Sequence, residues 1–231
     1  MKIRQYEVED MLTTYFKELC KKYKIDNVEF ICFSTWIEFI EIQYKDRYRR
    51  YCKTSEDLFN EIQGNAGLYC DTAMFSVYDN PHKNDPDKIE HKIIFTEEAF
   101  YKMMFMINTA NFEITKEEFF EYLRLCLLHE FGHVVSLNTL FERYGVLEGT
   151  EMLSEKEEQE FPEFMAYVHE SLDNLELLDA YISEKGRMTK YYEMTSERMA
   201  NETVNVDVDR FIDLDMKIRQ NIIPSTGSDT K

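Results

Sequence analysis

Two histidines and a glutamate in the middle of the chain have the types and spacing of a metal site. The sequence His129-Glu130-Phe131-Gly132-His133 is an H-E-x-x-H motif flanked by apolar residues. Residues four apart lie about 40° from each other around an α-helix, so both imidazoles project from one face and can bind a single ion. Zinc suits these two ligands, and the Glu130 carboxylate can reach a water on that ion as a general base.

The surroundings of the motif favour a metal site over a chance pattern. Two unpaired imidazoles among Leu, Phe and Val would be unfavourable in a core, whereas metal coordination satisfies one nitrogen of each ring. Gly132 fits as well, because a helix residue without a side chain lets another element approach beside the metal. We therefore expect a structural element to pack closely against the helix at Gly132.

A zinc ion bound by two histidines needs a third protein ligand, with the fourth position left for water. The later part of the chain offers three candidates: His169, Glu163 and Glu197. His169 stands on an expected helix, where a histidine is more often a surface or packing residue. Glu163 is followed one turn later by Tyr167, which is poorly suited to supporting a ligand histidine.

Glu197 is the favoured third ligand because of the residues that follow it. Asn201 lies one helical turn later, where its side-chain oxygen can accept a hydrogen bond from a ligand histidine. Ala200 is small enough for its helix to pack closely on the helix of the motif. Glu197 is favoured over Glu163 on these grounds, and both stay open at this stage.

The chain resembles the gluzincins, zincin metallopeptidases with H-E-x-x-H on one helix and a metal-binding Glu on a second. The resemblance rests on His129, Glu130 and His133 together with Glu197 and Asn201. The usual second motif is E-x-x-x-D or E-x-x-A-D, and this chain has Asn201 where Asp is common. A single-domain gluzincin of small size has an N-terminal helix, a small sheet, the active-site helix and the glutamate helix, and residues 6–210 follow this order.

The resemblance implies two further roles. In zincins the edge strand before the active-site helix pairs with extended substrate, and Ile89–Phe95 occupies that place in the sequence. Tyr191 and Tyr192, shortly before Glu197, are candidates for the electrophile that stabilises the tetrahedral oxyanion.

Hydrophobic periodicity predicts the elements that position these residues. Helices are expected at Tyr6–Tyr23, Ser55–Ile62 and Thr96–Ile107, and a long helix opens at a capping box of Thr115 and Glu118. Strands are expected at Val28–Phe33, Trp36–Tyr44, Leu68–Tyr78 and Ile89–Phe95, the first two as a hairpin, with a loop at 79–87.

These elements indicate an α+β fold of zincin type, in which an N-terminal helix and a small mixed sheet pack on a long active-site helix. We expect one domain over residues 1–222. Its β-containing part covers 1–112, its helical part covers 113–222 with the metal site, and residues 223–231 form a disordered tail.

Composition narrows the setting and the partners. The 231 residues include 27 Lys plus Arg and 45 Asp plus Glu, for a net charge of −18, which disfavours a general nucleic-acid binder. No apolar run is long enough to span a bilayer, and the five cysteines form no Cys-x-x-Cys pair. We expect a cytoplasmic protein with reduced thiols, no membrane partner and a protein or peptide substrate.

The sequence thus predicts a zinc metallopeptidase that hydrolyses peptide bonds through a metal-activated water, with Glu130 as general base and His129, His133 and Glu197 as ligands. The alternative hypothesis is a catalytically silent protein that keeps the scaffold for binding or regulation. Its acidic surface would then engage a basic partner.

Overall fold

The computed structural model describes residues 2–35, 38, 73–79, 89–109, 114–144, 192–193 and 195–219. Within these ranges it contains five helices and a small three-stranded mixed sheet, which confirms the predicted α+β class. The elements are α1 (Gln5–Tyr23), β1 (Val28–Ser34), β2 (Met74–Asp79), β3 (Glu90–Thr96), α5 (Glu97–Thr109), α6 (Lys116–Tyr144), α11 (Thr195–Val204) and α12 (Val208–Arg219).

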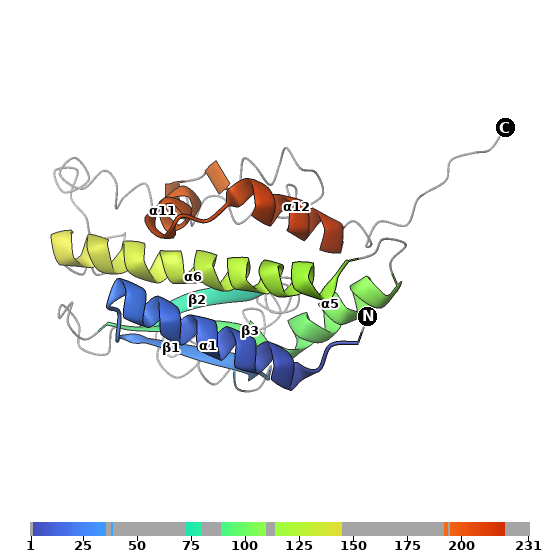
Figure 1. The fold of residues 1–231 in the computed structure, drawn as a ribbon. Coiled ribbons are helices and arrows are strands. Elements are labelled where there is room, and N and C mark those ends of the chain that lie inside the picture. The colour runs from blue at the N-terminus through green and yellow to red at the C-terminus, as the bar shows by residue number, and fades with distance from the viewer. Residues whose placement is uncertain are drawn as a thin grey trace, which may run out of the picture.

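The long helix α6 runs through the middle of the molecule (Figure 1). The sheet and α1 lie on one side of it, and α11 and α12 lie on the other. The predicted capping box opens it, since the Glu118 backbone N–H donates to the Thr115 hydroxyl and the Thr115 N–H donates to the Glu118 carboxylate, each at 3.1 Å. No helix of the described ranges combines the length and apolar character needed to cross a bilayer.

The sheet has the strand order β1-β3-β2, with β1 parallel and β2 antiparallel to β3. The prediction that Ile89–Phe95 forms an edge strand is therefore wrong, because β3 is paired on both sides. Its side chains at Ile93, Ile94 and Phe95 are fully buried, so both faces of the strand are covered. A continuous apolar run of this kind is typical of a central strand.

The described pairing partner of β1 is β3. Of the second strand of the predicted hairpin, Trp36–Tyr44, the structure describes only Glu38, which is helical, so most of the predicted hairpin lies outside the described residues. The Thr35 N–H donates to the Glu38 carboxylate at 2.9 Å, and the Glu38 N–H lies 3.4 Å from the Thr35 hydroxyl. The helical state of Glu38 differs from the strand that the β-type residues predicted at this position.

An aromatic core joins α1 and α6. The fully buried Phe131 of α6 packs edge-on against Phe16, with ring centroids 6.1 Å apart, and lies 5.7 Å from Tyr23. Phe16 in turn lies 5.5 Å from Phe30 of β1. Helix α6 is thereby fixed against both α1 and the sheet, so the motif that contains Phe131 rests on a rigid base.

The pair α11 and α12 is anchored to the N-terminal half of α6. Asn205 ends α11 in the left-handed region at φ 57°, which turns the chain into α12. The Arg210 guanidinium donates to both carboxylate oxygens of Glu121, at 2.9 and 2.6 Å, and the buried Tyr122 hydroxyl donates to Asp215 at 2.6 Å. These contacts hold α12 on α6 and so set the position of α11.

The described parts of the other predicted elements agree with the structure. The predicted helices at Tyr6–Tyr23 and Thr96–Ile107 correspond to α1 and α5, and the end of Leu68–Tyr78 forms β2. The predicted helix Ser55–Ile62, most of the loop at 79–87 and the tail at 223–231 lie outside the described residues.

Candidate metal centre

Helices α6 and α11 approach each other most closely at a glycine. A Cβ atom placed on Gly132 would lie 2.2 Å from the backbone carbonyl oxygen of Ala200, a separation that no real Cβ contact has. Ala200 is itself completely buried. The two small residues therefore allow the backbone contact that the sequence predicted, and this contact brings α11 alongside the histidines.

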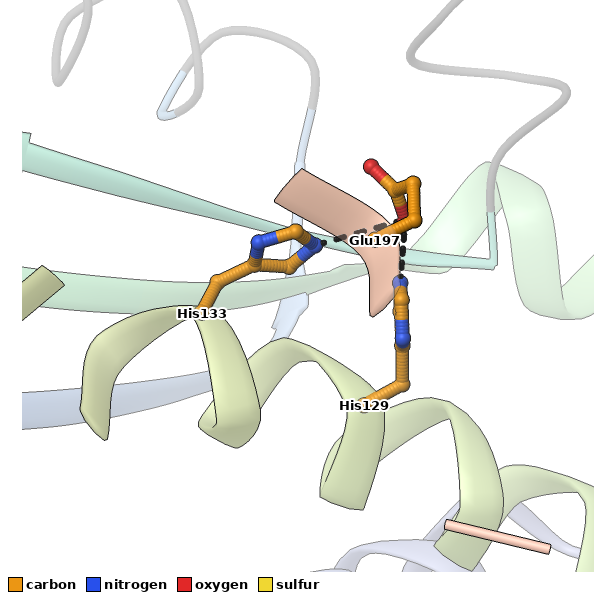
Figure 2. A group of neighbouring side chains, drawn as sticks. All are labelled: His129, His133 and Glu197. Atoms are coloured by element: carbon orange, nitrogen blue, oxygen red, sulfur yellow. Dashed lines mark ion pairs between the residues drawn. The ribbon is translucent and has the colours of Figure 1, made fainter. Parts of the chain in front are cut away.

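Three side chains converge at this crossing (Figure 2). The Oε2 atom of Glu197 lies 2.9 Å from Nε2 of His129 and 3.5 Å from Nε2 of His133. One ligand atom from each residue falls within 4.8 Å of the others. Donor atoms placed tetrahedrally at ~2.0–2.1 Å from a zinc ion would be about 3.3 Å apart, so the cluster has the size of a metal-binding triad.

The buried Glu197 carboxylate lies against the two imidazoles. Its Oε2 atom is shielded from solvent and lies 2.9 and 3.5 Å from the Nε2 atoms of His129 and His133. A buried carboxylate is unfavourable unless a cation, such as a protonated imidazole or a metal ion, neutralises it. Two imidazoles and one carboxylate form a known ligand set for a divalent transition metal, so these three residues could hold a metal ion.

The same crowding shifts the protonation of the site. Burial lowers the pKa of His129, but the adjacent Glu197 carboxylate outweighs it and raises this pKa to about 9. Burial raises the pKa of Glu197, and the two histidines outweigh it and hold that pKa well below its usual range. Both shifts show that the cluster attracts positive charge, which a proton or a metal ion can supply.

Asn201 fixes the orientation of the first histidine, as predicted. Its Oδ1 atom lies 2.8 Å from Nδ1 of His129, and both residues are buried. An amide oxygen only accepts hydrogen bonds, so Nδ1 of His129 carries a proton in this contact. The Nε2 atom of His129 is thereby turned toward Glu197 as a potential metal ligand.

Glu130 projects from α6 about 100° round the helix from His129 and lies close enough to the cluster to interact with its charges. Burial raises the pKa of its carboxyl group, the neighbouring His129 and His133 act to lower it, and the Glu197 charge adds to the rise. The Ser76 side chain on β2 has the smallest of these effects and acts to lower the pKa. The general-base role of Glu130 stays a prediction.

The described part of the chain places one of the two candidate tyrosines beside the cluster. The ring of Tyr192 meets His129 edge-on with centroids 5.5 Å apart, and Phe211 packs 5.4 Å from Tyr192 and 5.9 Å from His129. An aromatic wall thus supports the imidazole on the side of α12. Tyr191 lies outside the described residues, and the electrophile role of either tyrosine stays a prediction.

The structure also bears on the choice of third ligand. Glu197 lies with the two histidines, as predicted. Glu163 and His169, the other two candidates, lie outside the described residues.

Sequence reasoning missed Phe211, whose ring packs beside His129 and Tyr192 from α12. No protein-family model, curated protein or solved structure was found to match the chain.

Proposed function

We propose that the chain is a zinc-dependent metallopeptidase of gluzincin type. The observation that carries this proposal is the convergence of His129, His133 and Glu197, with Glu130 on the same helix as the two histidines. Supporting it, Asn201 orients His129, and the Gly132–Ala200 contact allows the two helices to approach. The H-E-x-x-H spacing on a helix is the motif of zinc proteases.

The side chains supply the parts of a hydrolysis. Zinc bound by the triad would lower the pKa of a coordinated water toward about 7 and polarise the scissile carbonyl. Glu130 takes a proton from the attacking water while the water oxygen bonds to the carbonyl carbon. Glu130 then delivers this proton to the amide nitrogen as the C–N bond breaks, so that a carboxylic acid and an amine leave the site.

The arrangement of the sheet favours an extended peptide as substrate. Among the described strands β2 pairs only with β3, and it lies beside α6, where Tyr78 packs on Phe141. A peptide that adds to β2 through backbone hydrogen bonds would pass along the helix that carries Glu130. The strand-pairing role predicted for Ile89–Phe95 therefore moves to β2 in this proposal.

The decisive experiment combines a metal assay with a cleavage assay. Zinc-loaded protein should cleave an unfolded protein substrate, and a chelator should stop the reaction. The variant Glu130→Gln should keep its zinc and lose roughly 100- to 10,000-fold in turnover. A matched control is Glu202→Gln, an exposed change on α11, which should cleave like the wild type.

Two outcomes would overturn the peptidase proposal. The first is cleavage that resists the chelator or persists unchanged in Glu130→Gln. The second is stoichiometric zinc without cleavage of either folded or unfolded proteins, which would favour the alternative of a binding or regulatory protein with an acidic surface.

A further inference from the structure

Helix α11 ends at a buried residue, Val204, whose side chain and backbone are almost fully shielded from solvent. The last carbonyl groups of a helix have no partner within it, so each must be satisfied from outside. The turn after α11 satisfies two of them. The Val206 N–H donates to the Asn201 carbonyl at 2.9 Å, and the Asn205 N–H donates to the Glu202 carbonyl at 3.4 Å. The Val204 carbonyl is not part of this turn, so another element must meet it.

The group that meets the Val204 carbonyl is a tyrosine 181 residues earlier in the chain. Tyr23 is the last residue of α1, and its hydroxyl donates to the Val204 carbonyl oxygen at 3.2 Å. Helices α1 and α11 lie on opposite sides of α6, so the Tyr23 side chain reaches past α6 (Figure 1). Its ring packs on Phe131 of the H-E-x-x-H motif, with centroids 5.7 Å apart. One side chain thus contacts both helices of the metal centre.

The backbone around Tyr23 makes it a fixed point. Lys24 follows it in the left-handed region at φ 57°, and the Ile25 N–H donates back to the Cys20 carbonyl at 3.1 Å. This closed turn ends α1 and leads the chain into β1. Tyr23 is therefore held by both a helix end and the start of the sheet.

The contacts of α11 with the rest of the site lie along one stripe of that helix. Glu197, Ala200 and Val204 are three and four residues apart, so they face the same side. Ala200 contacts Gly132 of α6 backbone to backbone, which prevents any closer approach at that point. Along the helix axis Ala200 lies ~4.5 Å from Glu197 and ~6 Å from Val204. A rigid helix that tilts about Ala200 therefore moves its two ends in opposite directions.

Metal binding is sensitive to such a tilt. A displacement of ~1 Å at the Val204 end moves the Glu197 end by roughly 0.8 Å, from the axial distances above. Ligand distances in a metal site are defined to within about 0.2 Å. The Gly132–Ala200 contact sets how close α11 comes to α6, but a single contact leaves the tilt of α11 free. A second contact, at the far end of the helix, is needed to fix it.

We propose that Tyr23 is a positioning residue for the metal centre. Its hydroxyl holds the Val204 end of α11 and thereby sets the distance of Glu197 from the two histidines. This inference rests on the metal centre of the proposed function. It adds α1 to the elements that shape the centre, although α1 supplies no ligand.

The test uses Tyr23→Phe, which removes the hydroxyl and keeps the ring on Phe131. Helix α11 should then populate several tilts, and only a fraction of them presents Glu197 correctly to the ion. The zinc dissociation constant should therefore rise by roughly 3- to 10-fold, as measured by competition with a chromogenic chelator. Tyr15→Phe is the matched control, because Tyr15 is a partly buried tyrosine about 12 Å earlier on α1, and it should bind zinc like the wild type.

Two further measurements separate positioning from a general loss of stability. Circular dichroism checks the fold, and if Tyr23→Phe is only partly folded, trimethylamine N-oxide favours the folded state and all proteins are compared in it. In crystals of the zinc-free variant, the separation of Glu197 Oε2 from His129 Nε2, here 2.9 Å, should lengthen or take several values. A less stable Tyr23→Phe protein with wild-type zinc affinity, or an unmoved α11, would overturn the positioning role.

The outcomes also separate this inference from the proposed function. Peptide cleavage by a Tyr23→Phe protein with wild-type zinc affinity would leave the peptidase in place and remove the role of Tyr23. A wild-type protein that cleaves no peptide, but whose zinc affinity depends on the Tyr23 hydroxyl, would reject the peptidase and retain the role of Tyr23.

Discussion

Gly132 and Ala200 touch through their backbones, so closely that a methyl group on Gly132 would lie 2.2 Å from the Ala200 carbonyl oxygen. This contact places the helix of Glu197 next to the two histidines. Because the site is assembled from two helices, its geometry depends on this contact as much as on the ligands. The first prediction follows from it.

Gly132→Ala should destabilise the protein and weaken metal binding. In an open helix this change stabilises by roughly 0.5–1 kcal/mol, because alanine has the higher helix propensity. Here α11 must move away from α6, and overpacking of this kind typically costs about 1–3 kcal/mol. Urea unfolding should show a loss of stability together with a lower zinc affinity. The exposed change Thr139→Ala on the same helix should leave both quantities nearly unchanged. A stabilised Gly132→Ala protein would contradict the close packing.

Removal of a ligand should reduce metal binding more than any change around the site. His133→Ala and Glu197→Gln each take away one of three convergent donors, so the expected loss of zinc affinity exceeds the roughly 10- to 100-fold cost of losing an outer hydrogen bond. Elemental analysis and competition with a chromogenic chelator measure this loss. Glu202→Gln on the same helix is the control. Full zinc stoichiometry in either ligand variant would rule out that residue as a ligand.

Asn201 offers a graded test of the site. Asn201→Leu removes the acceptor of the His129 Nδ1 proton, so zinc affinity should fall by roughly 10- to 100-fold. Asn201→Asp replaces the amide with a carboxylate, which raises the basicity of the His129 imidazole and so strengthens its bond to the metal. Zinc should then bind more tightly by up to about tenfold. The measurement is the zinc dissociation constant at fixed pH. Equal affinities in all three proteins would show that the contact has no role in metal binding.

The buried His91 should make the free energy of unfolding depend on pH. Burial lowers its pKa to about 4, against the hydrogen bond to Asn138 that acts to raise it. The unfolded chain therefore takes up a proton near pH 6.5 while the folded protein does not. The unfolding free energy is therefore unaffected by His91 above about pH 6.5 and decreases as the pH falls from about 6.5 to about 4. At about 1.4 kcal/mol per pKa unit, the total decrease is about 3 kcal/mol.

The variant His91→Gln isolates this effect, because its amide can donate to Asn138 without titrating. The difference in unfolding free energy between wild type and variant should shrink or reverse between pH 7 and pH 4, as followed by urea titration. A difference that is constant over this range would show that His91 keeps an ordinary pKa in the folded protein.

The local parts of the fold and site could be predicted from the sequence. The Thr115–Glu118 capping pair, the position of α6 and the role of Gly132 depend on spacing within one helix or on the absence of a side chain. The choice of Glu197 rested on the pattern it forms with Asn201, again within one helical turn. Periodicity reports such features directly.

The parts that were missed are pairings between segments far apart in the chain. Nothing in the β1 segment indicates that its partner is β3. The central position of β3, with β2 on its other side, depends on the strand order, which composition and periodicity do not encode.

The wide separation of the site residues has a consequence for synthesis of the chain on the ribosome. His129 emerges 72 residues before Asn201, and at roughly 5–20 residues per second this interval lasts about 4–14 s. During that time the nascent chain displays the paired imidazoles without the helix that carries Glu197. Any ion that needs all three side chains can therefore bind only after α11 has been made.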